Sequence, residues 1–280
     1  MRIVICAKEV LDPDAVNNYA LAGRLVIGED GVTLTQTTIP QLMNAYDEQA
    51  LEAALRIRDA GTECTIAVVS AAADPTALLR HAGALGADEI AAISLPASSQ
   101  DGHVVARLLA AYIRSSGGAD LVLCGRQASD DDQGVVPALI GEALEMPVVT
   151  VARSVEAVGS PEPSGVRVTR VTPDGDEVVE AACPAVVTIS NELGDPRYPT
   201  AAKKLAARRM KPTVLSPDDL SLGPGDLQPR VRLTRQFVPT VQGNCEFITG
   251  DSPAELADRL VERLREERVL LTKSEGKTAS

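Results

Sequence analysis

The sequence of 280 residues contains no tryptophan, and aromatic residues of all kinds make up only 2% of it. Because 45% of the residues are hydrophobic, we expect a sizeable core built from Val, Leu, Ile and Ala instead. Basic residues are also scarce: 27 Lys and Arg stand against 39 Asp and Glu, which leaves a net charge of −12. This balance argues against nucleic acid and against an anionic membrane surface as partners, because both carry negative charge.

Two further signals are missing from the chain. No apolar run approaches the ~20 residues that span a bilayer, and a predicted strand begins at Arg2, which leaves no room for a signal peptide. We therefore expect a soluble, cytoplasmic protein that is not membrane-spanning. The five cysteines include no Cys-x-x-Cys pair, and neither His81 nor His103 has an acidic or cysteine partner at ligand spacing. Reduced cysteines and no metal site are the expectation.

Short apolar runs alternate with helical patterns over the first 150 residues. The predicted strands cover residues 2–7, 65–69, 90–93, 121–124 and 148–151, and the predicted helices cover residues 47–61, 74–85, 102–115 and 136–144. This alternation with short connections predicts an α/β fold with three layers, in which helices cover both faces of a parallel sheet. A ligand crevice is expected where the strand ends at Ala7, Ser70 and Gly125 meet.

Beyond residue 152 the pattern changes. Alternating residues at 166–171 and 177–182 predict a β-hairpin, and residues 185–189 predict a further strand. The helix predicted for 201–210 is basic, which indicates either a docking face or a solvated helix face. We expect the α/β domain to cover 1–211. Residues 212–280 are expected to form a proline-rich linker and a C-terminal arm, whose amphipathic helix starts at Ser252 and must fold back or dock on another subunit.

The stretch from Ala119 to Glu145 places a strand, a glycine turn and a helix start in succession. Gly125 permits a tight turn, and the polar segment 126–133 leads to the helix. Free amides and the positive end of a helix dipole meet an anion in this geometry. Two interpretations stay open: a phosphate-binding turn, or an ordinary loop with an acidic N-cap. Since aspartates repel phosphate, the amides, Arg126 and the Ser129 hydroxyl would have to hold it.

Five collinear stretches together resemble the beta subunit of the electron-transfer flavoprotein, over about residues 1–270. They are Ile3–Val10 (IVICAKEV), Met43–Asp47 (MNAYD) with the helix that follows, Gly125–Asp132 (GRQASDDD), the segment from Arg170 to Thr188 with its acidic hairpin and Pro184, and Asp195–Tyr198 (DPRY) before the basic helix.

The resemblance implies a Rossmann-like, HUP-type adenine-nucleotide-binding fold with β-hairpin additions. It implies a heterodimer in which the alpha subunit holds or shares FAD, and in which this chain binds AMP or a second FAD. The implied electron donor is a dehydrogenase or NADH, and the implied acceptor is a quinone oxidoreductase or ferredoxin. The chain would then be an electron carrier subunit, because no nucleophile–base pair is found and the flavin supplies the chemistry.

The resemblance also implies the residues that contact the nucleotide. Ala7 and Lys8 would border it, Ser70 and Ala71 would lie at the second strand end, and Tyr46 is a candidate neighbour of the alpha-subunit flavin. The adenosine side would be lined by Asn44, Ala45, Tyr46 and Asp47. The phosphates would be held by Gly125, Arg126, Gln127, Ala128, Ser129, Asp130, Asp131, Asp132, Gln133, Gly134, Val135 and Val136.

Two other functions remain open on the residues alone. One is a stand-alone adenine-nucleotide sensor or structural module, which predicts a stable monomer without flavin. The other is an enzyme that activates substrates with ATP. That enzyme needs a glycine-rich pyrophosphate loop after the first strand, where this chain has Ala7-Lys8-Glu9-Val10. We therefore rank the enzyme last.

Overall fold

One sheet of nine strands organises the first part of the chain, in the order β11-β5-β4-β1-β6-β10-β7-β8-β9. The structure is a computed structural model that describes residues 1–35, 38–96, 101–159, 163–238 and 245–269. The strands from β11 to β7 run parallel, and β7, β8 and β9 are antiparallel. Their bounds are β1 Arg2–Cys6, β4 Thr65–Ala72, β5 Glu89–Ser94, β6 Leu121–Gly125, β7 Val148–Val158, β8 Gly165–Thr172, β9 Gly175–Ala182, β10 Ala185–Ile189 and β11 Thr213–Leu215.

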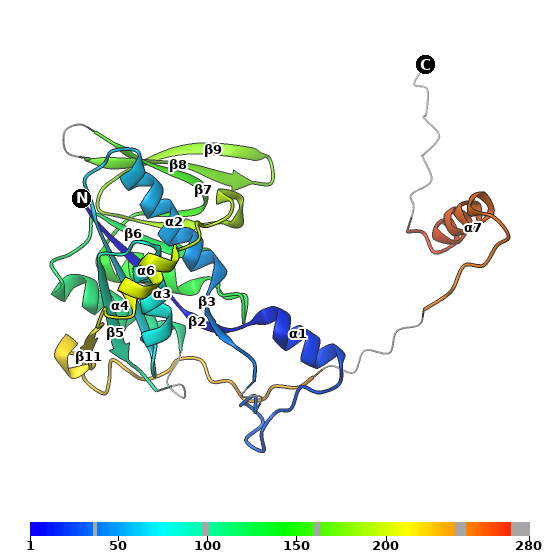
Figure 1. The fold of residues 1–280 in the computed structure, drawn as a ribbon, viewed down its shortest axis with the longest axis horizontal. Helices are drawn as coiled ribbons and strands as arrows, with labels where there is room; N and C mark the ends of the chain where they lie inside the picture. The colour runs from blue at the N-terminus through cyan, green and yellow to red at the C-terminus, as the bar shows by residue number, and fades with distance from the viewer. Residues whose placement is uncertain (36–37, 97–100, 160–162, 239–244, 270–280) are drawn as a thin grey trace. The chain divides into compact units, whose positions relative to one another are not determined.

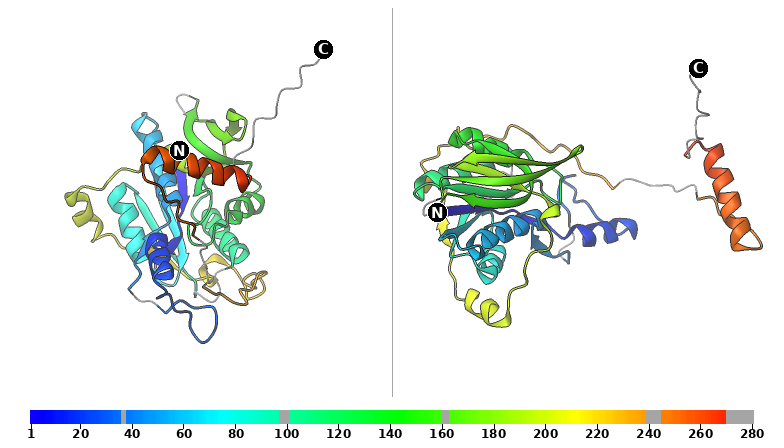
Figure 2. Two further views of the ribbon diagram at one scale, coloured as in Figure 1. Left: turned by 90° about the vertical axis from the view of Figure 1, so that its right-hand side faces the viewer. Right: turned by 90° about the horizontal axis from the view of Figure 1, so that it is seen from above.

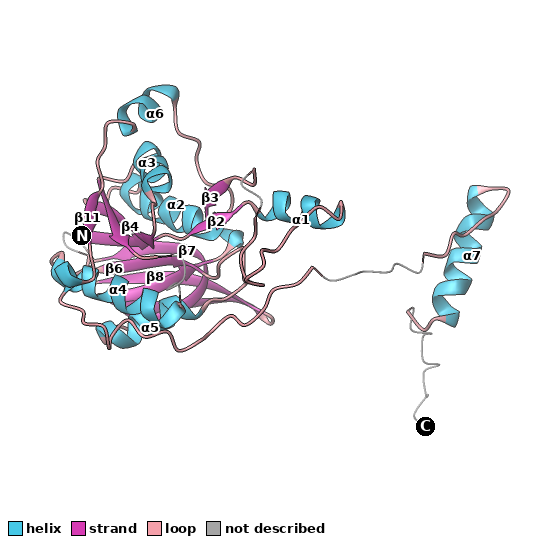
Figure 3. Cartoon of the chain, turned by 90° about the horizontal axis from the view of Figure 1, so that it is seen from below, coloured by secondary structure: helices cyan, strands magenta, loops and turns pink. Residues whose placement is uncertain are grey.

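Helices cover both faces of this sheet, so the predicted three-layer α/β fold is confirmed (Figure 1). Figure 3 shows α2 and α3 on one side of the strands, and α4 and α5 on the other. In β1 the side chains of Ile3 and Ile5 join the core with α2 and α3, whereas Val4 and Cys6 join the core with α4 and α5. The bounds are α2 Ala45–Asp59, α3 Thr76–Leu85, α4 Gly102–Ser115 and α5 Val135–Leu144.

The chain reverses its direction of winding at β1. From β1 it proceeds to β4 and then β5 on one side, and it returns to place β6 on the other side of β1. Such a reversal opens a crevice at the carboxyl ends of the two strands, because their connections leave toward opposite faces. The loops after β1 and β6 therefore lie where the sequence predicted a ligand crevice.

The antiparallel strands β7 to β9, drawn in green in Figure 2, extend the sheet, and β8 and β9 form the predicted hairpin. Strands β10 and β6 are parallel neighbours, which brings Ile189 beside Gly125 at the crevice edge. The hairpin lies within the predicted domain 1–211, and β10 returns from it into the centre of the parallel sheet.

Two segments differ from the sequence-based expectation. No helix was predicted before residue 47, but α1 covers Pro13–Leu21. The Asp12 carboxylate starts this helix by accepting hydrogen bonds from Asp14 N and Ala15 N. Residues 212–231, predicted as a linker, first add β11 beside β5 and then bury Leu220 in a 3-10 turn. The remaining elements are β2 Glu9–Leu11, β3 Gln41–Met43, η2 Asn191–Leu193, α6 Ala201–Ala207 and η3 Asp218–Leu220.

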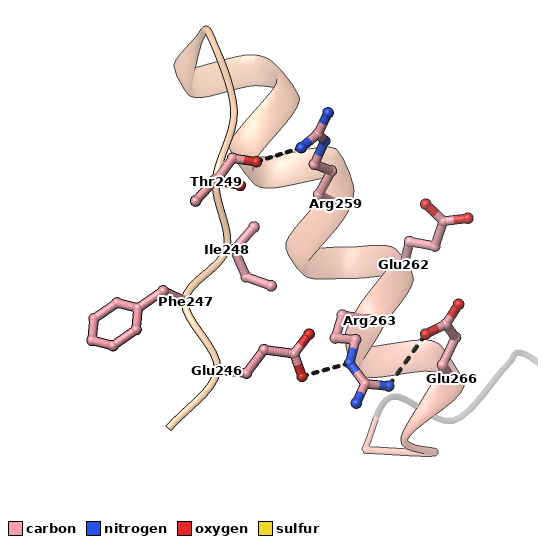
Figure 4. A pocket seen from close by; sticks show the side chains of 8 residues that line it. All are labelled: Glu246, Phe247, Ile248, Thr249, Arg259, Glu262, Arg263 and Glu266. Atoms are coloured by element: carbon pink, nitrogen blue, oxygen red, sulfur yellow. Dashed lines mark hydrogen bonds and ion pairs between the residues drawn. The ribbon is translucent and has the colours of Figure 1, made fainter. Parts of the chain in front are cut away.

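The chain divides into two compact units, residues 1–237 and 238–280. In the second unit, α7 (Pro253–Glu266) starts as expected with Ser252 as its N-cap, but the Glu255 side chain accepts from the Asp251 amide. The extended segment 245–249 before this helix is held to α7 by Glu246–Arg263 and Thr249–Arg259 contacts (Figure 4). A cavity of about 260 Å³ with charged walls lies between them. Within the described ranges, no helix combines the length and apolarity that crossing a membrane requires.

Candidate functional site

The two loops at the winding reversal begin side by side. Cys6 at the end of β1 and Cys124 near the end of β6 are register partners in adjacent parallel strands. Ala7 and Lys8 follow the first strand, and Gly125 with Arg126 follows the second. Ala7 also donates its backbone N–H to Val69 O at 2.9 Å, which brings the end of β4 to the same edge. The structure thus gathers three predicted strand ends in one place.

Asp47, in the first turn of α2, joins the two loops. One carboxylate oxygen accepts the Lys8 amide and the other accepts the Gly125 amide, each at 2.8 Å. The side chain is buried, and this desolvation raises the pKa of Asp47 to about 6, although both amide hydrogen bonds act in the opposite direction. The sequence predicted contact with adenosine for this residue, whereas both of its oxygens are engaged by the protein backbone.

Asn44 forms hydrogen bonds with the loop after β6, a few residues beyond Gly125. It occupies the N-cap position of α2, but its side chain makes no capping bond there. Instead its Nδ2 donates to Gln127 O at 2.9 Å, and its Oδ1 accepts from Ser129 N at 3.1 Å. The buried amide therefore shapes the predicted phosphate loop instead of capping α2.

Two glycines lie so close to neighbouring atoms that a side chain would not fit at either position. A Cβ at Gly125 would lie 2.6 Å from Asp47 Oδ1 and 2.6 Å from Tyr46 Cβ. A Cβ at Gly134 would lie 2.4 Å from Arg126 O. Both distances are far below ordinary van der Waals contact, so this loop geometry requires glycine at each position.

Arg126 connects the loop to β10 and to α2. Its amide donates to Ile189 O at 2.9 Å, its Nη1 donates to Ser190 Oγ at 3.4 Å, and its guanidinium lies 5.3 Å from the ring centroid of Tyr46. Its Nε is buried and lacks a hydrogen-bond partner within the described chain. Ser190 is wholly buried and was missed by the sequence reasoning. The sequence feature that could have identified Ser190 is its position directly after a buried parallel strand.

The aspartates of the loop are not free negative charges. Lys8 Nζ pairs with Asp130 at 2.7 Å and with Asp131 at 3.3 Å, and Gln127 Nε2 donates to Asp132 at 2.8 Å. None of them caps α5, whose N-cap is Gly134 without a side-chain bond. The acidic N-cap of the alternative interpretation is therefore wrong, and no described side chain caps the first amides of α5.

The remaining predicted residues differ in their exposure to solvent. Ser70 is buried, and its Oγ has no partner among the described residues. Ala128 is buried, Ala71 and Val136 are half-buried, and Ala45 is exposed together with the run from Gln133 to Val135. His81, expected to lack an acidic partner, lies 2.9 Å from Glu48 Oε1 across two helices. The described ranges contain no group of three side chains arranged to hold a metal ion.

We expect Asn44→Ala to loosen the loop after β6. The change leaves Gln127 O and Ser129 N without their partner, and burying such groups unpaired costs about 1–3 kcal/mol each. Hydrogen–deuterium exchange of the Ser129 amide should accelerate at least about tenfold, and thermal unfolding should shift downward. Asn17→Ala, at an exposed position of α1, is the control and should change neither. Unchanged Ser129 exchange would show that Asn44 does not hold the loop.

Comparison with known proteins shows the family to which the chain belongs. Residues 32–220, more than half of the chain, match the model of the electron transfer flavoprotein domain. The chain belongs to this family. The resemblance inferred from the five collinear stretches is thereby confirmed.

The relatives are similar over most of their length. The caffeyl-CoA reductase–Etf complex subunit CarD of Acetobacterium woodii is 34% identical over 276 residues, which cover 96% of this chain and all of the relative. An electron transfer flavoprotein subunit beta of Thermoanaerobacterium thermosaccharolyticum is 32% identical over the same extent. The acryloyl-CoA reductase electron transfer subunit gamma of Anaerotignum propionicum is 31% identical over 71% of this chain and 72% of the relative.

Proposed function

We propose that this chain is the beta subunit of a heterodimeric electron-transfer flavoprotein, which binds an adenine nucleotide, AMP or FAD, in the crevice between β1 and β6. Family membership and the relatives named as beta and electron transfer subunits support a beta-type role in electron transfer. The observation that carries the nucleotide proposal is the joint fixation of both crevice loops by Asn44 and Asp47.

The donors that this loop offers fit a phosphate ester. The Gly125 amide already donates to Asp47 and is not free to bind phosphate. The proposed phosphate donors are therefore the first amides of α5, at Val135 and Val136, and the Ser129 hydroxyl. The buried and unpartnered Nε of Arg126 and Oγ of Ser70 are further groups that suit a polar ligand. Lys8 pairs with two of the loop aspartates, and its positive charge offsets part of the repulsion that they exert on an anion.

The redox chemistry belongs to FAD, held by or shared with an alpha subunit. FAD accepts electrons from a dehydrogenase or NADH and passes them to a quinone oxidoreductase or another acceptor in this proposal. The residues of this chain bind and orient the nucleotide through the crevice loops. The ring of Tyr46, covered on one face by Arg126, is the proposed neighbour of the alpha-subunit flavin.

The second unit is proposed as the arm that docks on the alpha subunit. None of the residues of α7 is buried, and Leu260 is 46% exposed although it lies on the apolar stripe of the helix. Phe247, in the adjoining extended segment, is 84% exposed. A single helix cannot bury such a stripe against itself, and covering these side chains from water favours association with a partner.

The experiment that tests the function is co-expression with a neighbouring alpha-type subunit. We expect a heterodimer that contains flavin, and its cofactors can be released by denaturation and counted by chromatography. One FAD with one AMP would indicate a conventional electron shuttle, whereas two FAD without AMP would indicate a complex that splits electron pairs. A monomer without flavin would instead support the stand-alone nucleotide sensor.

A further inference from the structure

We infer that Glu52 is a positioning residue that clamps residues 191–198 onto α2, and that nucleotide binding at the crevice tightens this clamp. The inference rests on the proposed nucleotide site and adds a regulatory property to it. The clamped segment leads directly into Tyr198, which is 93% exposed, and into the basic helix α6. Nucleotide binding in the crevice would thus reduce the mobility of a second surface of the same unit, formed by Tyr198 and α6.

Three side chains on one face of α2 hold the clamped segment through its backbone. Gln49 Nε2 donates to Gly194 O at 3.2 Å, and Arg56 Nη1 donates to Leu193 O at 2.9 Å. Glu52 lies between them on the helix. Its carboxylate accepts hydrogen bonds from the Arg197 amide at 3.2 Å and from Arg197 Nε at 2.7 Å. Spacings of three and four residues place these side chains in one row on the helix surface.

Glu52 is the centre of this row because it carries a buried charge. Its side chain is only 7% exposed, and it also accepts from Arg56 Nε at 3.0 Å. Burial by itself raises the pKa of Glu52, but hydrogen bonds from Arg197 and Arg56 outweigh it and hold this pKa below its ordinary value. The carboxylate is therefore ionised at neutral pH and paired with two guanidinium groups, which makes the hydrogen bonds charge-assisted.

Packing of the segment is incomplete beside its one buried apolar side chain, Leu193. A cavity of about 390 Å³ lies between α2, β7 and the 3-10 turn η2, and Arg56 and Leu193 are among its walls. A segment that borders such a space relies more on its polar contacts with α2. Removal of Glu52 should therefore release the segment locally without unfolding the sheet.

The clamp and the crevice loop share two physical connections. The first is α2 itself, since Asn44 and Asp47 at its start hold the loop, while Gln49, Glu52 and Arg56 further along hold the segment. The second is direct, because Arg126 of the loop contacts Ser190, and the Ser190 hydroxyl contacts Glu192 within η2.

These connections fix the direction of the effect. A nucleotide that orders the loop also fixes Arg126, and an ordered Arg126 holds Ser190 at the start of the clamped segment. A segment whose anchor is already fixed loses less conformational entropy when it closes, so nucleotide and clamp favour each other.

The clamp is tested with Glu52→Gln in the purified heterodimer. The variant removes the charge but keeps the size of the side chain, and amide exchange of residues 193–197 should become at least about tenfold faster. Asp59→Asn is the matched control, because Asp59 contacts the same Arg197 at an exposed position and such pairs contribute little. Arg197→Gln removes the other half of the clamp and should reproduce the effect. Wild-type exchange in both Glu52→Gln and Arg197→Gln would overturn the clamp.

The coupling is tested by repeating the exchange with AMP added to nucleotide-free heterodimer. In the wild type we expect AMP to protect residues 125–134 and to slow exchange of 193–197 about fivefold or more. In Glu52→Gln the loop should still be protected, but the segment should not respond. Protection of the loop alone in the wild type would overturn the coupling while leaving the proposed function intact. Protection of neither region would overturn both.

Discussion

Gly125→Ala should abolish nucleotide retention by the purified heterodimer. The new methyl carbon would lie 2.6 Å from Asp47 Oδ1, the same oxygen that accepts the Gly125 amide. The loop must move away from α2 to relieve this contact, and it then loses a hydrogen bond to a charged group, worth about 1.5–3 kcal/mol. Because the proposed nucleotide site depends on the placement of this loop, nucleotide affinity should fall at least about tenfold. The measurement is nucleotide content after gel filtration, beside the circular dichroism spectrum.

The appropriate control for this change is Gly225→Ala. A Cβ at Gly225 meets no atom within 4 Å, and its backbone is not among the positive-φ glycines. Nucleotide content should therefore be unchanged, which separates the loss of glycine in general from the loss of space at the crevice. Overpacking at Gly125 should also cost about 1–3 kcal/mol of stability, but the sheet should stay folded. Full nucleotide content in Gly125→Ala would remove this loop from the site.

The position of the candidate site could be predicted from the sequence because it follows from local pattern and topology. The apolar run 121–124, the glycine that follows and the helix pattern beyond it identify a strand, a turn and a helix start without knowledge of distant contacts. The parallel arrangement then requires the strand ends after Ala7 and Gly125 to meet. These inferences depend on periodicity, which the sheet and its covering helices impose on the sequence.

The roles of individual polar side chains could not be predicted in the same way. Asn44 precedes a helix and has the composition of an N-cap, but its side chain reaches a loop more than 80 residues later. Lys8 and the loop aspartates are separated by 122 and 123 residues, so no local pattern reveals that they neutralise one another. Tertiary contacts decide these partners, and local propensity is only a weak guide to them.

The proline-rich stretch after residue 212 shows a second limit of the sequence reasoning. Its composition is typical of a linker, and yet residues 213–215 pair with β5 at an edge of the sheet. An edge strand needs only one hydrogen-bonded neighbour and tolerates flanking prolines, so three residues suffice and leave little periodicity to detect. Helix α1 was missed for a related reason. It buries none of its residues, so its sequence carries no clear apolar stripe.

The buried carboxylate of Asp47 predicts a specific pH dependence of stability. Its pKa is about 6 in the folded protein, above the ordinary value of 3.8. Between these two values the folded state binds more protons at this site than the unfolded state does. The free energy of unfolding contributed by Asp47 is thus greatest below pH 3.8, and it declines as the pH rises toward 6. The sign is opposite to that of Glu52 and Asp101, whose pKa values are lowered.

Comparison with Asp47→Asn isolates this contribution, because asparagine does not titrate and the other groups cancel in the difference. The free energy of unfolding of the wild type minus that of the variant should fall by about 2 kcal/mol between pH 4 and pH 7, as measured by urea denaturation. A difference that stays constant or rises over this range would contradict the burial of an ionisable Asp47. The expected result means that the protein keeps a desolvated carboxylate at neutral pH. Only an ionised carboxylate offers both oxygens as full acceptors to the Lys8 and Gly125 amides, so the cost in stability maintains the geometry of the crevice.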